Sequence, residues 1–210
     1  MVLALIILTA ASQQTAAAND YDWACPPERY AIASARLQEI KDADQADRQG
    51  GLGADVIERD KARRQEVGAL FGEGCIRSGS DHYNAALVFQ HGQVPDHYYQ
   101  AYLFARRASD LGEADGSWLV PRAVDRYLLN SGYKQLFGTN LTCRRDEDGD
   151  QRCCVPPVAD GFPDAQRTAA GEPPIGDKLA SVAERMDMPE IGFCKDDRRD
   201  PPRGLFPGIW

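Results

Sequence analysis

The chain has 210 residues, of which 32 are acidic and 24 are Lys or Arg, so its net charge is −8 at neutral pH. This balance argues against binding to nucleic acid or to anionic lipid, because phosphate groups require a concentrated positive surface. The length fits a single domain.

The first 18 residues have the pattern of a signal peptide. An uncharged apolar run, VLALIILTAA, spans residues 2–11, and the alanines at 16–18 supply an A-x-A cleavage site, although no basic residue precedes the run. We predict cleavage after Ala18, a single domain over residues 19–195 and an irregular tail over residues 196–210. The alternative is a buried N-terminal helix. No later segment reaches the roughly 18 apolar residues of a membrane span, so the mature chain is expected to be periplasmic or secreted.

Five segments before residue 132 repeat apolar residues at helical spacing, and the short joins between them favour antiparallel neighbours. The predicted helices begin near Pro26-Pro27 and end at Gly50, and then cover Ala54 to Phe71, about 81–92 with Ser80 as N-cap, His97 to Leu111, and Gly116 to Ser131. From Gly138 onward Pro, Gly and Asp become frequent, with a predicted hairpin at about 141–155 and a short helix from Asp177 to Met186. The sequence therefore predicts a mainly α protein, an antiparallel array of about five helices with a small disulfide-linked β-hairpin and an irregular C-terminal tail.

An even number of cysteines in an exported chain predicts disulfides. The six are Cys25, Cys75, Cys143, Cys153, Cys154 and Cys194. A two-residue turn at Asp148-Gly149 places Cys143 opposite Cys154, and a slightly different turn places it opposite Cys153. One of the two neighbouring cysteines should then reach one of the three distant ones. Because C-x-x-C spacing is absent and no His accompanies the cysteines, we predict no metal site, and we predict no cofactor.

Polar residues beside the apolar stripes are the candidate site, because a polar group in such a place must be paired or hydrated. The candidates are Asp44, Arg48, Gln90, His91, Asp125, Arg126, Gln135 and Thr139. We assign His91 and Asp125 as catalytic candidates, since imidazole titrates near neutral pH, and either Asp44 or Asp125 is able to orient it. The other residues are ligand-binding candidates. Among them, either of the two arginines would bind a carboxylate or phosphate through paired hydrogen bonds. Asp60 and Arg63 are expected on the inner face of the second helix.

Three of these strings resemble a widespread bacterial family that is known mainly as an uncharacterised helical domain. They are DQADR at 44–48, ALVFQHG at 86–92 and DRYLLNSGYKQLFGTN at 125–140. The family pattern is D-Q-x-x-R, then Q-H, then D-R followed by G-x-x-Q-x-(Y/F)-G-T-Q, and residues 178–192 resemble its closing segment. The chain departs from it at Asn140, where the family has Gln, at 186–188, which replace a Gly-Leu pair, and in the cysteine-bearing hairpin. The resemblance implies a helical fold and no particular activity.

The leading hypothesis is an exported helical binding or interaction module with a polar pocket around His91, for a small polar ligand or a protein partner. The alternative is a metal-independent hydrolase in which His91 is the general acid or base, although the sequence has no G-x-S-x-G nucleophile motif. A third reading is a concave protein-binding surface that exposes Tyr98, Tyr99 and Tyr102. The competing structural interpretation is that the polar groups only satisfy one another.

Overall fold

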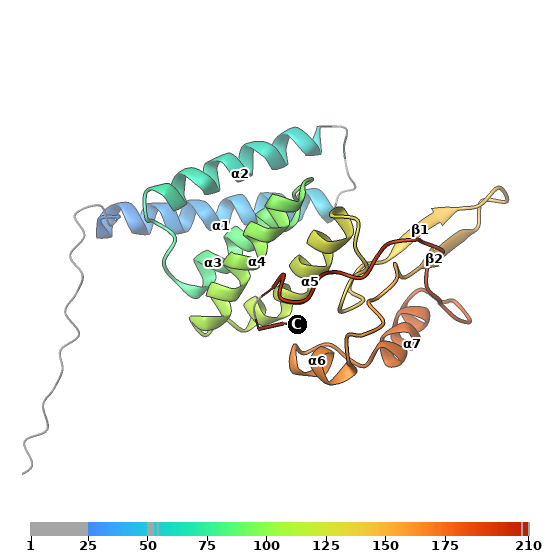
Figure 1. Ribbon diagram of the computed structural model, residues 1–210. Helices are drawn as coiled ribbons and strands as arrows, with labels where there is room; N and C mark the ends of the chain where they lie inside the picture. Colours follow the sequence, from blue (N-terminus) through green and yellow to red (C-terminus); the bar gives the residue numbers. More distant parts are fainter. Residues whose placement is uncertain (1–24, 50–52, 54, 207, 210) are drawn as a thin grey trace, which may run out of the picture.

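The computed structural model describes residues 25–49, 53, 55–206 and 208–209, and it confirms the predicted mainly helical class (Figure 1). The predicted signal peptide lies outside these residues. The five longer helices are α1 (Pro27–Gln49), α2 (Val56–Gly72), α3 (Gly79–Gln90), α4 (Pro95–Asp110) and α5 (Ala114–Asn130). They are followed by strands β1 (Thr142–Arg145) and β2 (Gln151–Cys154) and by the short helices α6 (Asp164–Ala169) and α7 (Ile175–Arg185).

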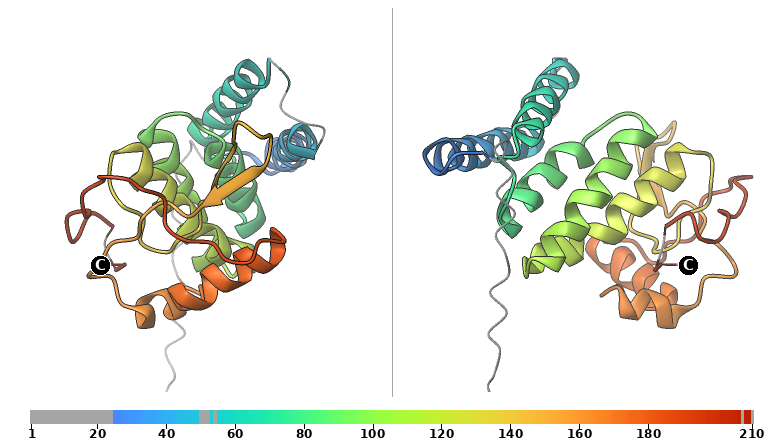
Figure 2. Two further views of the ribbon diagram at one scale, coloured as in Figure 1. Left: turned by 90° about the vertical axis from the view of Figure 1, so that its right-hand side faces the viewer. Right: turned by 60° about the vertical axis from the view of Figure 1, so that its left-hand side comes forward.

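The long helices stack in chain order. α1 and α2 form an antiparallel pair at one side, α3 to α5 follow, and the hairpin, α6 and α7 lie at the opposite side (Figure 2). Small residues allow the central helices to approach closely, since Ala101 and Ala105 of α4 are fully buried. A Cβ on Gly116 would lie 2.6 Å from the backbone nitrogen of Ser109, so this glycine permits the close contact between α4 and α5.

The start of α3 differs from our prediction. Its N-cap is Ser78 and not Ser80, because the Ser78 hydroxyl accepts from the Asp81 N–H at 3.0 Å and the Asp81 carboxylate accepts from the Ser78 N–H at 2.9 Å. The same carboxylate accepts hydrogen bonds from Tyr30 and Ser34 of α1, at 2.9 and 2.6 Å. The capping box therefore also fixes α3 against α1.

Three disulfides form, and the hairpin register decides between the two pairings that the sequence allowed. Cys143 lies opposite Cys153 and bonds to it, Cys154 bonds to Cys194, and Cys25 bonds to Cys75. The turn of the hairpin is centred on Asp148 and is one residue longer than the predicted two-residue turn. Gly149 in this turn has a φ of +87°. The Asp146 side chain stabilises the turn by accepting from the Asp148 and Asp150 N–H groups.

The C-terminal tail has no helix or strand over its described residues, as predicted, but it belongs to the packed domain. Phe206 is only 2% exposed. Its ring lies 4.9 Å from the ring of Tyr102, 5.3 Å from Tyr127 and 5.9 Å from Tyr99. The tail therefore closes the core over α4 and α5.

No helix in the described ranges combines the length and the apolar character that crossing a membrane requires.

We expect Phe206→Ala to lower the free energy of unfolding by about 3–5 kcal/mol, because it leaves an aromatic-sized cavity beneath the tail. Urea denaturation measures this loss. Phe193→Ala is the matched control, since Phe193 is 45% exposed and should cost far less. Equal losses for the two variants would contradict the packed position of the tail.

Candidate functional site

The centre of the candidate site is a contact between α1 and the end of α3. Asp44 is completely buried, and its Oδ2 lies 2.7 Å from Nδ1 of His91, the residue directly after α3. The carboxylate also accepts from the Gln45 amide at 2.9 Å and from Arg48 at 3.2 Å. A carboxylate that accepts these bonds leaves Nδ1 of His91 as the donor, so Nε2 of the neutral ring holds the free lone pair.

Arg48 joins this contact to α2. Its guanidinium donates to Asp60 at 2.7 Å as well as to Asp44, and Arg63 donates to the other Asp60 oxygen at 2.9 Å. Asp60 lies on the inner face of α2, as expected, and so does Arg63, whose side chain is only 12% exposed and pairs with Asp60. Arg64 is buried as well, with 8% of its surface exposed.

The carbonyl end of α3 is covered by side chains from three other helices. Arg126 donates to the carbonyl of Gln90, and Arg64 donates to the carbonyl of His91 at 3.3 Å. The Tyr98 hydroxyl donates to the carbonyl of Gly92 at 2.6 Å. Cations and hydroxyl donors are favourable here, because the last carbonyls of a helix lack partners and bear partial negative charge.

Neither Arg64 nor Arg126 has a carboxylate partner among the described residues; each donates to a backbone carbonyl instead. Burial lowers the pKa of the Arg64 guanidinium and that of Arg126. Both guanidinium groups interact electrostatically with Asp44, Arg48 and Tyr98, so they belong to one cluster. The cluster thus holds two desolvated guanidinium groups that are attracted by Asp44, and in the case of Arg64 also by Asp60, but that form no direct ion pair within the described residues.

The cluster also contains polar atoms that the fold leaves unused. Within the described part of the chain, Oε1 of Gln90 and Nε of Arg48 are buried without a hydrogen-bond partner. Of the two ring nitrogens of His91, only Nδ1 forms a hydrogen bond within the described residues, and 17% of the side chain is exposed. In a fold that satisfies nearly all buried polar groups, these atoms are available to a ligand.

Asp125 lies in a separate network. It is fully buried, and its oxygens accept from the N–H groups of Leu136, Phe137 and Thr139 and from the Thr139 hydroxyl, at 2.7–3.0 Å. Burial raises the pKa of the Asp125 carboxyl, while these hydrogen bonds act in the opposite direction. Asp125 therefore anchors the segment after α5, and Asp44 is the carboxylate that orients His91.

Gln135 belongs to this second network. Its amide donates to the Pro156 carbonyl at 2.7 Å, and its side-chain oxygen accepts from the Asn140 N–H at 3.2 Å. The side chain is completely buried. Of the sequence candidates, the structure groups Asp44, Arg48, Gln90, His91 and Arg126 at the end of α3. It places Asp125 of α5 with Gln135 and Thr139 of the segment that follows α5.

Sequence reasoning missed Arg64 and the hydroxyl of Tyr98 as members of the site. Arg64 follows Asp60 by four residues, which is the spacing of side chains on one helix face and was the available signal. Tyr98 and Tyr102 are each 6% exposed, and Tyr99 lies against Phe206. Tyr98 and Tyr102 therefore pack in the interior, and of the three tyrosines only Tyr99, which is 37% exposed, reaches the surface.

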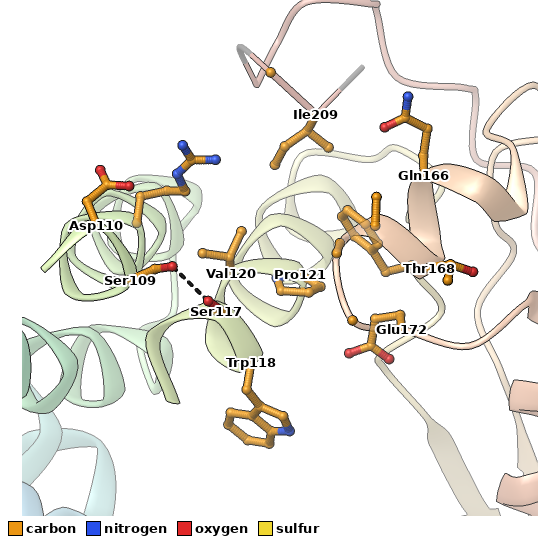
Figure 3. A pocket seen from close by; sticks show the side chains of 16 residues that line it. Ser109, Asp110, Ser117, Trp118, Val120, Pro121, Gln166, Thr168, Glu172 and Ile209 are labelled. Carbon is orange, nitrogen blue, oxygen red and sulfur yellow. Dashed lines mark hydrogen bonds between the residues drawn. The ribbon is translucent and has the colours of Figure 1, made fainter. Parts of the chain in front are cut away.

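A further cavity lies elsewhere in the described residues. It has a volume of about 650 Å³ and lies between α4, α5 and the α6 region (Figure 3). Ser109 and Ser117 in its wall hydrogen-bond to each other at 2.7 Å. Glu172 pairs with Arg122 and Lys178. Three of its polar side chains are thus used within the fold, and it includes none of the predicted site residues.

Within the described ranges, no group of three or more His, Cys, Asp or Glu side chains is arranged to hold a metal ion. Comparisons with family models, with curated proteins and with solved structures found no significant match for this chain.

We expect Asp125→Asn to lower the free energy of unfolding by about 2–3 kcal/mol, because an amide nitrogen would face N–H donors that now meet a carboxylate. Thermal or urea denaturation measures the change. Asp110→Asn, at an exposed position on α4, is the matched control and should be nearly neutral. A neutral Asp125→Asn would show that the network does not anchor the segment.

Proposed function

We propose that this chain is an exported binding protein for a small carboxylate-bearing molecule, with its site at the end of α3. The supporting observation is that the desolvated guanidinium groups of Arg64 and Arg126 donate to backbone carbonyls and form no ion pair with a carboxylate in the described residues. Buried charges in proteins are normally paired, and an unpaired one is costly. A ligand carboxylate would supply the missing charge.

The neighbouring groups suit such a ligand. Guanidinium groups bind carboxylates through paired, charge-assisted hydrogen bonds. Nε2 of His91 would accept a hydrogen bond from a ligand hydroxyl or amine, and the unpartnered amide of Gln90 would add specificity. A surface hollow of about 400 Å³, lined in part by Arg64, Phe89 and His97, lies next to this cluster and offers a route of entry.

Export is supported by the cysteines. All six are paired in disulfides, and such bonds persist in the periplasm and outside the cell but are rare in the reducing cytosol. The apolar run at residues 2–11 supplies a matching signal peptide.

We expect titration calorimetry of the oxidised protein with acetate, succinate and citrate to detect binding of the dicarboxylate or the tricarboxylate. Arg126→Met should weaken that binding at least about tenfold, since a hydrogen bond to a charged group contributes about 1.5–3 kcal/mol. Arg107→Met removes the same charge from an exposed position on α4 and is the control. Equal affinities for both variants would contradict the site, as would no binding of any carboxylate.

Gln90→Met gives an independent test. It removes a buried acceptor that has no partner, so the ligand-free protein should be as stable as the wild type or more stable, while carboxylate binding weakens. If Gln90 has only a structural role, the variant should instead lose stability. Thermal denaturation with and without citrate separates the two outcomes.

A hydrolase is the second candidate, and the Asp44–His91 geometry favours it. A carboxylate that fixes Nδ1–H leaves Nε2 able to act as general base toward water. In that case His91→Gln should reduce turnover of an ester substrate by about 10²–10⁴-fold. His82→Gln, near the start of α3 and away from the cluster, is the control, and equal turnover by the two variants would exclude His91 as the base.

A further inference from the structure

A second charged surface lies at the other end of the molecule, between the hairpin and the segment that follows α7. It is a groove with a volume of about 480 Å³. Arg144 and Arg152 of the hairpin form one wall, and Lys195 and Arg198 form part of the other. One acidic residue, Asp196, lines it. This concentration of positive charge is unusual in a chain with a net charge of −8.

The register of the hairpin places two arginines in direct opposition. Arg144 pairs with Arg152 across the two strands. Like charges in directly opposed positions destabilise a strand pair. Arg152 is partly compensated by an ion pair with Asp146 at 2.8 Å, whereas Arg144 has no hydrogen bond or ion pair within the described residues. Folding alone therefore does not account for Arg144 at this position.

The opposite wall likewise has, among the described residues, one cation with an acidic partner and one without. Arg198 is paired with Asp196, whereas Lys195 has no polar partner in the described part of the chain. The Cys154–Cys194 disulfide connects the two walls directly, because β2 ends at Cys154 and Lys195 follows Cys194. Arg144 and Lys195 are thus two uncommitted cations held on facing walls of one groove.

We propose that this groove binds a phosphate-bearing ligand. A phosphate presents several oxygens and more than one negative charge, which matches a guanidinium fork on one wall and an ammonium group on the other. Bound phosphate would also offset the repulsion between Arg144 and Arg152. The groove is distinct from the carboxylate site at the end of α3 and shares no residue with it.

The adjacent arginines of β1 allow a closely matched test. Successive side chains of a strand point to opposite faces, so Arg145 points away from the groove, and its guanidinium donates to the Gly149 carbonyl at 3.0 Å. Titration calorimetry of the oxidised full chain with inorganic pyrophosphate should show binding that Arg144→Gln weakens at least tenfold and Arg145→Gln changes less than twofold. The affinity should fall as salt is raised.

A second measurement tests whether the Arg144→Gln variant is folded. Arg144→Gln removes the cross-strand repulsion, so its melting temperature without ligand should equal or exceed that of the wild type. Vesicles of phosphatidylcholine containing phosphatidic acid form a parallel arm, in which Arg144-dependent binding would place the phosphate on a lipid headgroup and not on a soluble ligand. Absence of binding in both arms, or equal losses in Arg144→Gln and Arg145→Gln, would overturn the proposal.

Discussion

The buried carboxylate of Asp44 is the contact on which the helical array depends. It has no exposed surface and lies where α1, α2 and α3 meet. Its hydrogen bonds to Gln45 and Arg48 are within α1, and the one to His91 joins α1 to the end of α3. His91 connects it to the end of α3, and Arg48 connects it to Asp60 of α2. A charge in such a place persists only when its partners are in position, so the same interaction packs the helices and orients the imidazole.

A second buried carboxylate serves the other half of the molecule. Asp125 accepts from three backbone N–H groups and one hydroxyl, and so fixes the turn between α5 and the hairpin. The two acids differ in what surrounds them. Asp125 is enclosed by fixed donors within one network, whereas Asp44 lies beside arginines that lack carboxylate partners and a histidine that reaches solvent. That difference is the physical reason for proposing ligand binding near Asp44 and a structural role for Asp125.

Local patterns predicted most of the fold. Helical spacing located α1 to α5 and α7, glycines marked their ends, and the cysteine-flanked turn indicated the hairpin. The same reasoning placed Asp44 on an inward face with Arg48 one turn further and singled out His91, but it could not separate Asp125 from them, because which carboxylate meets His91 depends on how the helices pack. The hairpin register, the short α6 and the burial of Phe206 likewise depend on contacts distant in the sequence.

The most direct test of the Asp44–His91 contact is ¹⁵N NMR of the histidine side chains. In the neutral form His91 should have its proton on Nδ1, because Asp44 accepts from that atom. His97 is an internal control with the opposite tautomer, since its Nδ1 accepts from the Gln93 N–H. Asp44→Ala removes the acceptor, so it should abolish the preference at His91 and leave His97 unchanged. A proton on Nε2 of His91 in the wild type, or no response to Asp44→Ala, would contradict the contact and the site built on it.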